Sequence, residues 1–316
     1  MIDILAITTP FFIIIFIGSF SCKMGWFTQE HGQTLARFAF FVVLPPFMFL
    51  SITNSPITAS INVSFVFQYE ISTIIIFFTA FIIARKFFSL SNSDPAMFAL
   101  NASYPNYGYI GIPLCILAFG HKAAIPMALI LVADTVVLLT LTAVSEAQSN
   151  SSSLQRSLKN VALSMGRNPL LLSVLLGFSA LTFGITLPKT PILLLEILAG
   201  AAAPTALFAL GVTLIGQSIS SVKNEVGLLI VLKLAIHPIL TALIFLSWSM
   251  IGFSKLDVVW IKVAILFSCL PIAANVFALS QFYKAYSGIS AAAIMGSTII
   301  ASITVPLTLF LLKNLG

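Results

Sequence analysis

Long apolar stretches alternate with short polar connections from one end of the chain to the other. A helix needs about 20 mostly apolar residues to cross the hydrocarbon core of a bilayer, and ten stretches approach or exceed that length. The pattern therefore predicts an all-α integral membrane protein with ten transmembrane helices at residues 3–22, 33–53, 62–84, 94–119, 122–145, 168–186, 191–216, 225–250, 257–281 and 287–312.

Two of these segments carry helix breakers near their centres. The fourth contains Pro105, Asn106 and Gly108, and the ninth contains Pro271 and Asn275. A break exposes backbone N–H and C=O groups that lipid cannot satisfy, so it persists only where protein, water or a ligand takes them up. A pair of interrupted helices at corresponding places in two halves is typical of a secondary transporter.

The longest polar stretch divides the ten segments into two groups of five. Residues 146–167 are rich in Ser and Asn, and we interpret them as a cytoplasmic linker between a first repeat, residues 1–145, and a second, residues 168–316. Because five is odd, the second group enters the membrane from the opposite side, which predicts two inverted repeats. The Pro45-Pro46 pair in the second helix and Pro204 in the seventh agree with this correspondence.

Composition and charge favour the same class of protein. Of 316 residues, 59% are apolar and 8% are charged, and the mean hydropathy is +1.10. The net charge of +6 comes from scattered Lys and Arg that form no basic stripe, so we expect membrane lipids as surroundings and no nucleic acid as partner. Nine of these cations fall on one side of a ten-helix arrangement and five on the other. The positive-inside rule then places both termini outside the cell membrane, in the periplasm of a bacterium.

Neither a leader nor a metal site is expected. The first segment lacks a small-residue cleavage site after a short apolar core, so we expect an uncleaved first helix. Cys22, Cys115 and Cys269 show no metal-ligand spacing and are expected to be buried thiols. No cofactor is predicted.

The directions of the broken helices predict an anion site where they cross. The second halves of the fourth and ninth helices begin near mid-membrane, and their N-terminal ends approach from opposite faces. Such ends carry partial positive charge and unpaired N–H donors, which favour a carboxylate. Asn106 and Asn275 are predicted to orient this ligand, and Tyr104, Tyr107 and Tyr109 to form a wall beside it. The alternative is that the prolines only kink helices and the tyrosines only pack.

Four acidic or basic residues lie deep inside predicted spans, eight or more residues from either end, where charge is costly and function is the default hypothesis. They are Glu70, Asp134, Lys233 and His237. Glu70 and Lys233 lie at similar depths in corresponding helices, which predicts an ion pair beside the site. Alternatively, each side chain snorkels or lines a wet vestibule separately.

The other two residues have no evident partner in the sequence. Asp134 lies close to mid-membrane, where it is a candidate proton carrier or a hydrogen-bond partner of a neighbouring helix. His237 precedes Pro238, so it is a candidate cap for carbonyl groups that the proline frees, or a titrating group.

Asn101 and the run from Pro105 to Leu114, Pro-Asn-Tyr-Gly-Tyr-Ile-Gly-Ile-Pro-Leu, resemble the fourth-helix signature of the auxin efflux carrier family. That family includes bacterial members and plant PIN proteins, and its layout is similar to that of bile-acid symporters and some sodium/proton antiporters. The resemblance covers the whole chain. It implies a scaffold domain of helices 1, 2, 6 and 7, and a transport domain of helices 3–5 and 8–10 that moves like an elevator.

The resemblance also implies roles for individual residues. Pro105 and Asn106 match the crossover residues that support a bound carboxylate, and Pro271 matches the second crossover proline. Glu70 matches an acidic residue of the third helix. Plant members pair that acid with a lysine one turn on, where this chain has Ile74, and Lys233 is the candidate replacement. The middle loop is short and lacks the phosphorylated region of many plant members.

The leading prediction is a secondary carrier, not an enzyme, that exports or exchanges small organic anions across a bacterial plasma membrane. Membrane potential is the expected driving force, and coupling to protons is left open. Sodium-coupled symport by the same fold and a receptor without transport are alternatives. An intramembrane aspartyl protease would need a second mid-membrane aspartate, and ATP-driven pumping would need a P-loop.

The predicted site suits indole acetate, malate or another small carboxylate. The small-residue face from Gly200 to Ala203 permits close helix packing, either within one chain or in a homodimer.

Overall fold

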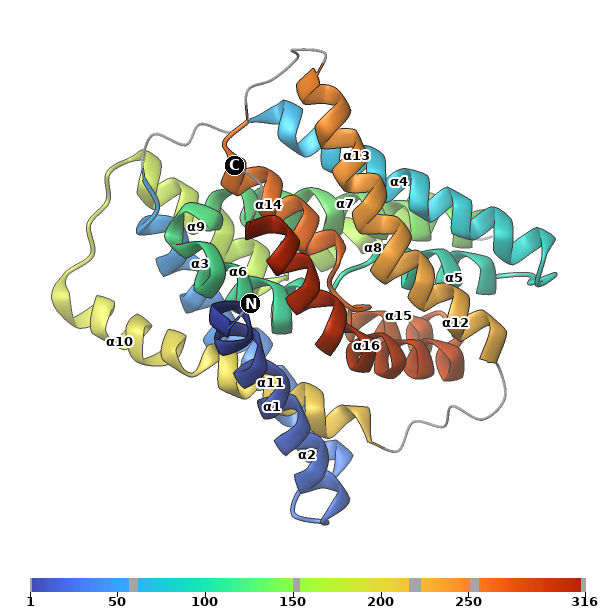
Figure 1. Ribbon diagram of the computed structural model, residues 1–316, viewed down its shortest axis with the longest axis horizontal. Helices are drawn as coiled ribbons and strands as arrows, with labels where there is room; N and C mark the ends of the chain where they lie inside the picture. Colours follow the sequence, from blue (N-terminus) through green and yellow to red (C-terminus); the bar gives the residue numbers. More distant parts are fainter. Residues whose placement is uncertain (1, 57–61, 150–153, 216–222, 251–255, 314–316) are drawn as a thin grey trace. The chain divides into compact units, whose positions relative to one another are not determined.

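The computed structural model describes residues 2–56, 62–149, 154–215, 223–250 and 256–313 (Figure 1). Over these ranges the chain is all-helical, with no β-strand and a single isolated β-bridge. Seven of the described helical stretches are long and apolar enough to cross a membrane, or eight if the bent pair Leu154–Gly166 and Pro169–Thr182 is one span. The chain is therefore a multi-pass membrane protein.

The two predicted broken spans explain part of the difference between these seven or eight stretches and the ten predicted transmembrane helices. The stretch 94–119 contains α5 (Asp94–Ser103), a gap, and then a helical run that continues from Tyr107 to Ser145. The stretch 257–281 contains α14 (Val258–Ser268) and α15 (Asn275–Phe282). Neither α5, α14 nor α15 is long enough alone to span a bilayer.

The chain forms two compact units, and each draws segments from both predicted repeats. The inverted repeat thus remains a prediction. The first unit comprises residues Met1–Ile61, Tyr107–Leu129 and Gly166–Gly216, and the second comprises Asn62–Asn106, Ile130–Met165 and Gln217–Gly316.

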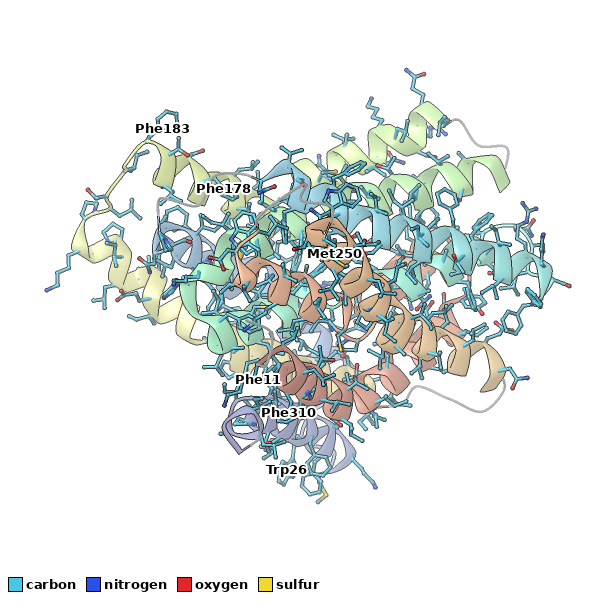
Figure 2. The ribbon with its side chains drawn as sticks, turned by 45° about the horizontal axis from the view of Figure 1, so that its top comes forward. Phe11, Trp26, Phe178, Phe183, Met250 and Phe310 are labelled. Atoms are coloured by element: carbon cyan, nitrogen blue, oxygen red, sulfur yellow. The ribbon has the colours of Figure 1, made fainter. Side chains whose placement is uncertain are left out.

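Close helix pairs build the first unit, with α1 against α11, α3 against α9, and α2 against α11. Large apolar side chains stay exposed around it, and Figure 2 shows Trp26 and Phe183 projecting from the turns after α1 and α9. Exposed aromatic side chains of this kind suit a lipid environment. The helices described in this unit are α1 (Ile2–Lys23), α2 (Gln29–Phe38), η1 (Ala39–Val43), α3 (Leu44–Thr53), η2 (Tyr107–Gly111), α6 (Ile112–Phe119), η3 (Gly120–Ala123), α9 (Pro169–Thr182), α10 (Lys189–Gly200) and α11 (Ala202–Leu214).

The second unit is organised around α4 (Val63–Lys86), which packs against α5 and α13 (Figure 1). The last helix, α16 (Ser287–Lys313), contacts α5, α12, α14 and α15. The remaining helices of this unit are α8 (Leu154–Gly166), whose last residue belongs to the first unit, α12 (Lys223–Val231), η4 (Leu232–Ile236) and α13 (His237–Met250). Helix α7 (Ala124–Ser149) begins in the first unit and continues into the second.

The predicted linker is largely helical, because α7 extends to Ser149 and α8 begins at Leu154. Residues 150–153 of that linker lie outside the described residues. No residue of α8 is buried.

Three segments of π-helix share one sequence cause. The described π segments η1, η2 and η4 each end two residues before a proline, at Pro45, Pro113 and Pro238 respectively. Proline offers no N–H to the carbonyl four residues earlier and its ring crowds that carbonyl. In all three cases that carbonyl lies inside the π segment. The wider π turn therefore accommodates the proline ring and the missing hydrogen bond.

Candidate functional site

The segments that follow α5 and α14 in the second unit meet at an isolated antiparallel bridge between Pro105 and Ile272. Helix α5 ends at Ser103, and Tyr104 is extended, with φ −87° and ψ 107°. The Asn106 N–H donates to the Pro271 carbonyl at 2.9 Å, and the Ala273 N–H donates to the Tyr104 carbonyl at 3.0 Å. The predicted breaks at Pro105 and Pro271 are thus confirmed.

Proline suits both positions in this bridge. Pro105 and Ile272 face each other as a non-hydrogen-bonded pair, so the ladder asks for no N–H from Pro105. Pro271 contributes only its carbonyl. Of the partners that the sequence left open for these backbone groups, which were protein, water or a ligand, the protein itself supplies those of the bridge.

Two serines of α16 that the sequence analysis did not single out form hydrogen bonds with the residues around the crossover. The Ile272 N–H donates to Ser297 Oγ at 3.2 Å, and the Asn101 side-chain amide donates to Ser290 Oγ and to the Met97 carbonyl, each at 2.8 Å. The signal was available, since serines seven residues apart lie on one face of an apolar helix. Asn101 uses its amide N–H groups within the chain and therefore joins α5 to α16 in this structure.

The two asparagines predicted to orient a ligand differ in environment. Asn106 is 3% exposed, whereas Asn275, the first residue of α15, is exposed. Tyr104 is buried, with Thr135 and Asp134 as neighbours.

Tyr107 and Gly108 lie in η2, which belongs to the first unit, so the predicted tyrosine wall remains a prediction. The convergence of two helix N-termini on one site also stays a prediction, because the second half of the fourth helix begins in that unit.

Lys233 is fully buried and caps the first half of the broken ninth helix. It lies in the π segment η4, and its Nζ donates to the Ser268 carbonyl at 2.7 Å. Ser268 is the last residue of α14, where the break leaves carbonyls without a partner in the next turn. A cation at a helix C-terminus is also favoured by the helix dipole. Lys233 Nζ lies 3.2 Å from His237 Nδ1 as well.

Glu70 of α4 and Asp134 of α7 are both buried and interact electrostatically with each other. None of their four carboxyl oxygens has a hydrogen-bond partner in good geometry. Lys233 is in turn an electrostatic neighbour of Asp134. The Glu70 oxygens accept no direct hydrogen bond from Lys233, so the pairing predicted for these two residues stays a prediction in its water-bridged form only. Asp134 is the charged neighbour of both residues.

His237 completes this group of buried polar residues. Its carbonyl lies 2.9 Å from Thr241 Oγ1, which lies 2.9 Å from Ser72 Oγ on α4. Its Nε2 is buried without a hydrogen-bond partner, and its ring lies 6.3 Å from that of Tyr69. Glu70, Asp134, Lys233 and His237 are called the charged cluster below. No group of three or more His, Cys, Asp or Glu placed to hold a metal ion occurs in the described part of the chain.

Comparisons with known proteins agree with a membrane protein that moves a solute. The family model described as "Membrane transport protein" matches residues 4–309. The chain is 29% identical to the "Putative malonate transporter" of Rhizobium meliloti (strain 1021), over 99% of this chain and 97% of that protein. It is 21% identical to the "Uncharacterized transporter YfdV" of Escherichia coli (strain K12), over 95% of each chain.

Proposed function

Since the chain belongs to the family of membrane transport proteins, we propose that it is a secondary carrier for small organic anions. Its membership agrees with the resemblance to auxin efflux carriers and makes it a membrane transporter, not an enzyme. The observation that carries the proposal is the bridged crossover, because paired discontinuous helices form the substrate site in many secondary transporters.

A dicarboxylate of the size of malonate is the proposed substrate class. The similar protein from Rhizobium meliloti carries that substrate in its name. In this chain the buried amide of Asn106 lies beside the bridge, and α15 begins with its positive dipole end three residues after Ile272. Asn106 would donate to a substrate carboxylate, while Asn101 and Ser297 keep the crossover in place from α5 and α16.

An elevator-type movement is the proposed mechanism. The second unit contains the fourth predicted helix up to Asn106, the whole broken ninth helix and the charged cluster. This unit has its own core, as expected of a transport domain that moves as a body. We propose membrane potential as a driving force. We also propose a bacterial inner membrane, with both termini outside, in line with the distribution of Lys and Arg.

Reconstitution in liposomes tests this function. Charge movement is recorded on a solid-supported membrane during concentration jumps of malonate, succinate, malate, acetate and indole acetate, with and without sodium, at two pH values. Counterflow of radiolabelled malonate is measured in parallel, because it also detects electroneutral exchange. A saturable response to one of these anions is expected. No current and no counterflow for any of them would contradict the proposal.

A further inference from the structure

The charged cluster has more negative charge than its one lysine can balance. Glu70 and Asp134 are buried beside each other, Thr73 is the hydroxyl neighbour of Asp134, and Lys233 is its charged neighbour. His237 adds no negative charge. The other titratable neighbours described are Tyr104, beside Asp134, and Cys269, beside Lys233.

Two carboxylates at close quarters in an apolar setting cannot both stay ionised at low cost, and one proton shared between them relieves the repulsion. With that proton bound, the pair carries one negative charge, Lys233 one positive charge, and the cluster is neutral. Without it, the cluster keeps one net negative charge inside the membrane, where uncompensated charge is expensive.

Lys233 connects this balance to the crossover. Its ammonium group donates to the carbonyl of Ser268, at the end of α14 and three residues before Pro271. Loss of the proton from the pair increases the pull of Asp134 on the same ammonium group. Lys233 then has two competing partners, the carboxyl pair and the end of the broken helix.

Resting on the carrier function proposed above, we propose that the Glu70–Asp134 pair binds a proton that moves with the anion, and that Lys233 transmits its presence to the broken helix α14. The anion-loaded unit crosses only with the protonated, neutral cluster, because a second uncompensated negative charge would add to that of the anion. The empty unit returns after the proton has left the pair. The proton enters the pair on one side of the membrane and leaves it on the other, so each cycle carries the proton in the same direction as the anion.

The test measures malonate and proton movement in the same proteoliposomes. Potassium and valinomycin hold the membrane potential at zero, a pH-sensitive dye reports the lumen, and counterflow of radiolabelled malonate reports exchange. In the wild type, an inward malonate gradient acidifies the lumen. Asp134→Asn and Glu70→Gln each leave the cluster neutral without a proton, so counterflow persists and the malonate-driven acidification is lost. Glu30→Gln, an exposed acid in the first turn of α2 and outside the predicted spans, is the matched control and retains both signals.

Lys233→Gln separates charge from capping. Glutamine keeps an N–H donor for the Ser268 carbonyl but removes the charge, so the pair needs a second proton for neutrality and malonate transport shifts to lower pH. Lys233→Arg retains the wild-type pH range. A lysine that acts only as a structural cap would leave the pH profile of Lys233→Gln unchanged.

The outcomes separate the two proposals. Wild-type counterflow without acidification, or acidification that survives in both amide variants, overturns the proton site and leaves the carrier standing. Loss of counterflow in both amide variants also overturns it, because the pair would then be needed for exchange itself. Absence of counterflow in the wild type, with malonate and the other anions, overturns both.

Discussion

In the first unit α1 and α11 approach until backbone meets backbone, whereas in the second unit buried polar side chains join α4, α7 and η4. A Cβ atom at Gly18 would collide with the Phe208 carbonyl oxygen, and one at Gly211 with the Ile15 carbonyl oxygen. The second unit instead buries Glu70, Asp134 and Lys233.

These are the two means by which helices associate in lipid, where no hydrophobic force separates apolar faces from their surroundings. Close glycine packing suits a part of the molecule that keeps one arrangement. Polar groups with alternative partners suit a part that changes state.

The largest expected effect on stability is at Lys233. Lys233→Leu leaves the Ser268 carbonyl uncapped and the carboxyl pair without its cation, and breaking a buried pair in this way costs about 3–5 kcal/mol. The measurement is the temperature at which half of the detergent-solubilised protein remains monodisperse. Lys233→Gln, which keeps a donor, should lose clearly less. Equal losses would show that the donor to Ser268 adds nothing.

An intermediate effect is expected from Gly211→Ala in the first unit. The new methyl group meets the backbone of Ile15 and cannot be accommodated by a side-chain rotation, so overpacking costs about 1–3 kcal/mol. Gly200→Ala is the control, because nothing lies within 4 Å of a Cβ there. The same thermal measurement should leave this control unchanged or slightly more stable. A harmless Gly211→Ala would remove the basis for contrasting the two units.

The smallest effect is expected at Ser297. Ser297→Ala removes the acceptor of the Ile272 N–H, and interhelical hydrogen bonds of this kind contribute about 1 kcal/mol in membranes. Ser302→Ala lies on the same helix, and its hydroxyl bonds only the Ile299 carbonyl of its own helix. Ser297→Ala is also measured in the Lys233→Gln background. If the two losses of stability add, Ser297 and Lys233 support the break around Pro271 independently of each other. Equal stability of Ser297→Ala and Ser302→Ala would contradict a role for Ser297 at the crossover.

The breaks were predictable from sequence because proline and its neighbours act locally. Hydropathy likewise indicated a multi-pass membrane protein, although seven or eight of the described helical stretches, and not ten, are long and apolar enough to cross a membrane. The partners of Glu70 and Lys233 were not predictable, since depth follows from residue counting but the face of a helix follows from tertiary packing.

Small-residue packing shows the same limit. The predicted face begins at Gly200, where no atom lies within 4 Å of the position that a Cβ would take, whereas the close contact between α1 and α11 is at Gly18 and Gly211. Glycine in an apolar helix correctly predicts close helix packing, but the sequence does not show which glycine lies against another helix.

Asn106 and Asn275 give the most direct test of the crossover as substrate site. Asn106 directly follows the bridge residue Pro105 and is buried, whereas Asn275 lies four residues after Pro271 and is exposed at the start of α15. Malonate counterflow is measured for Asn106→Ala and Asn275→Ala in liposomes with equal amounts of folded protein. The account predicts loss of counterflow for Asn106→Ala and near-normal counterflow for Asn275→Ala. Near-normal counterflow by Asn106→Ala would contradict it.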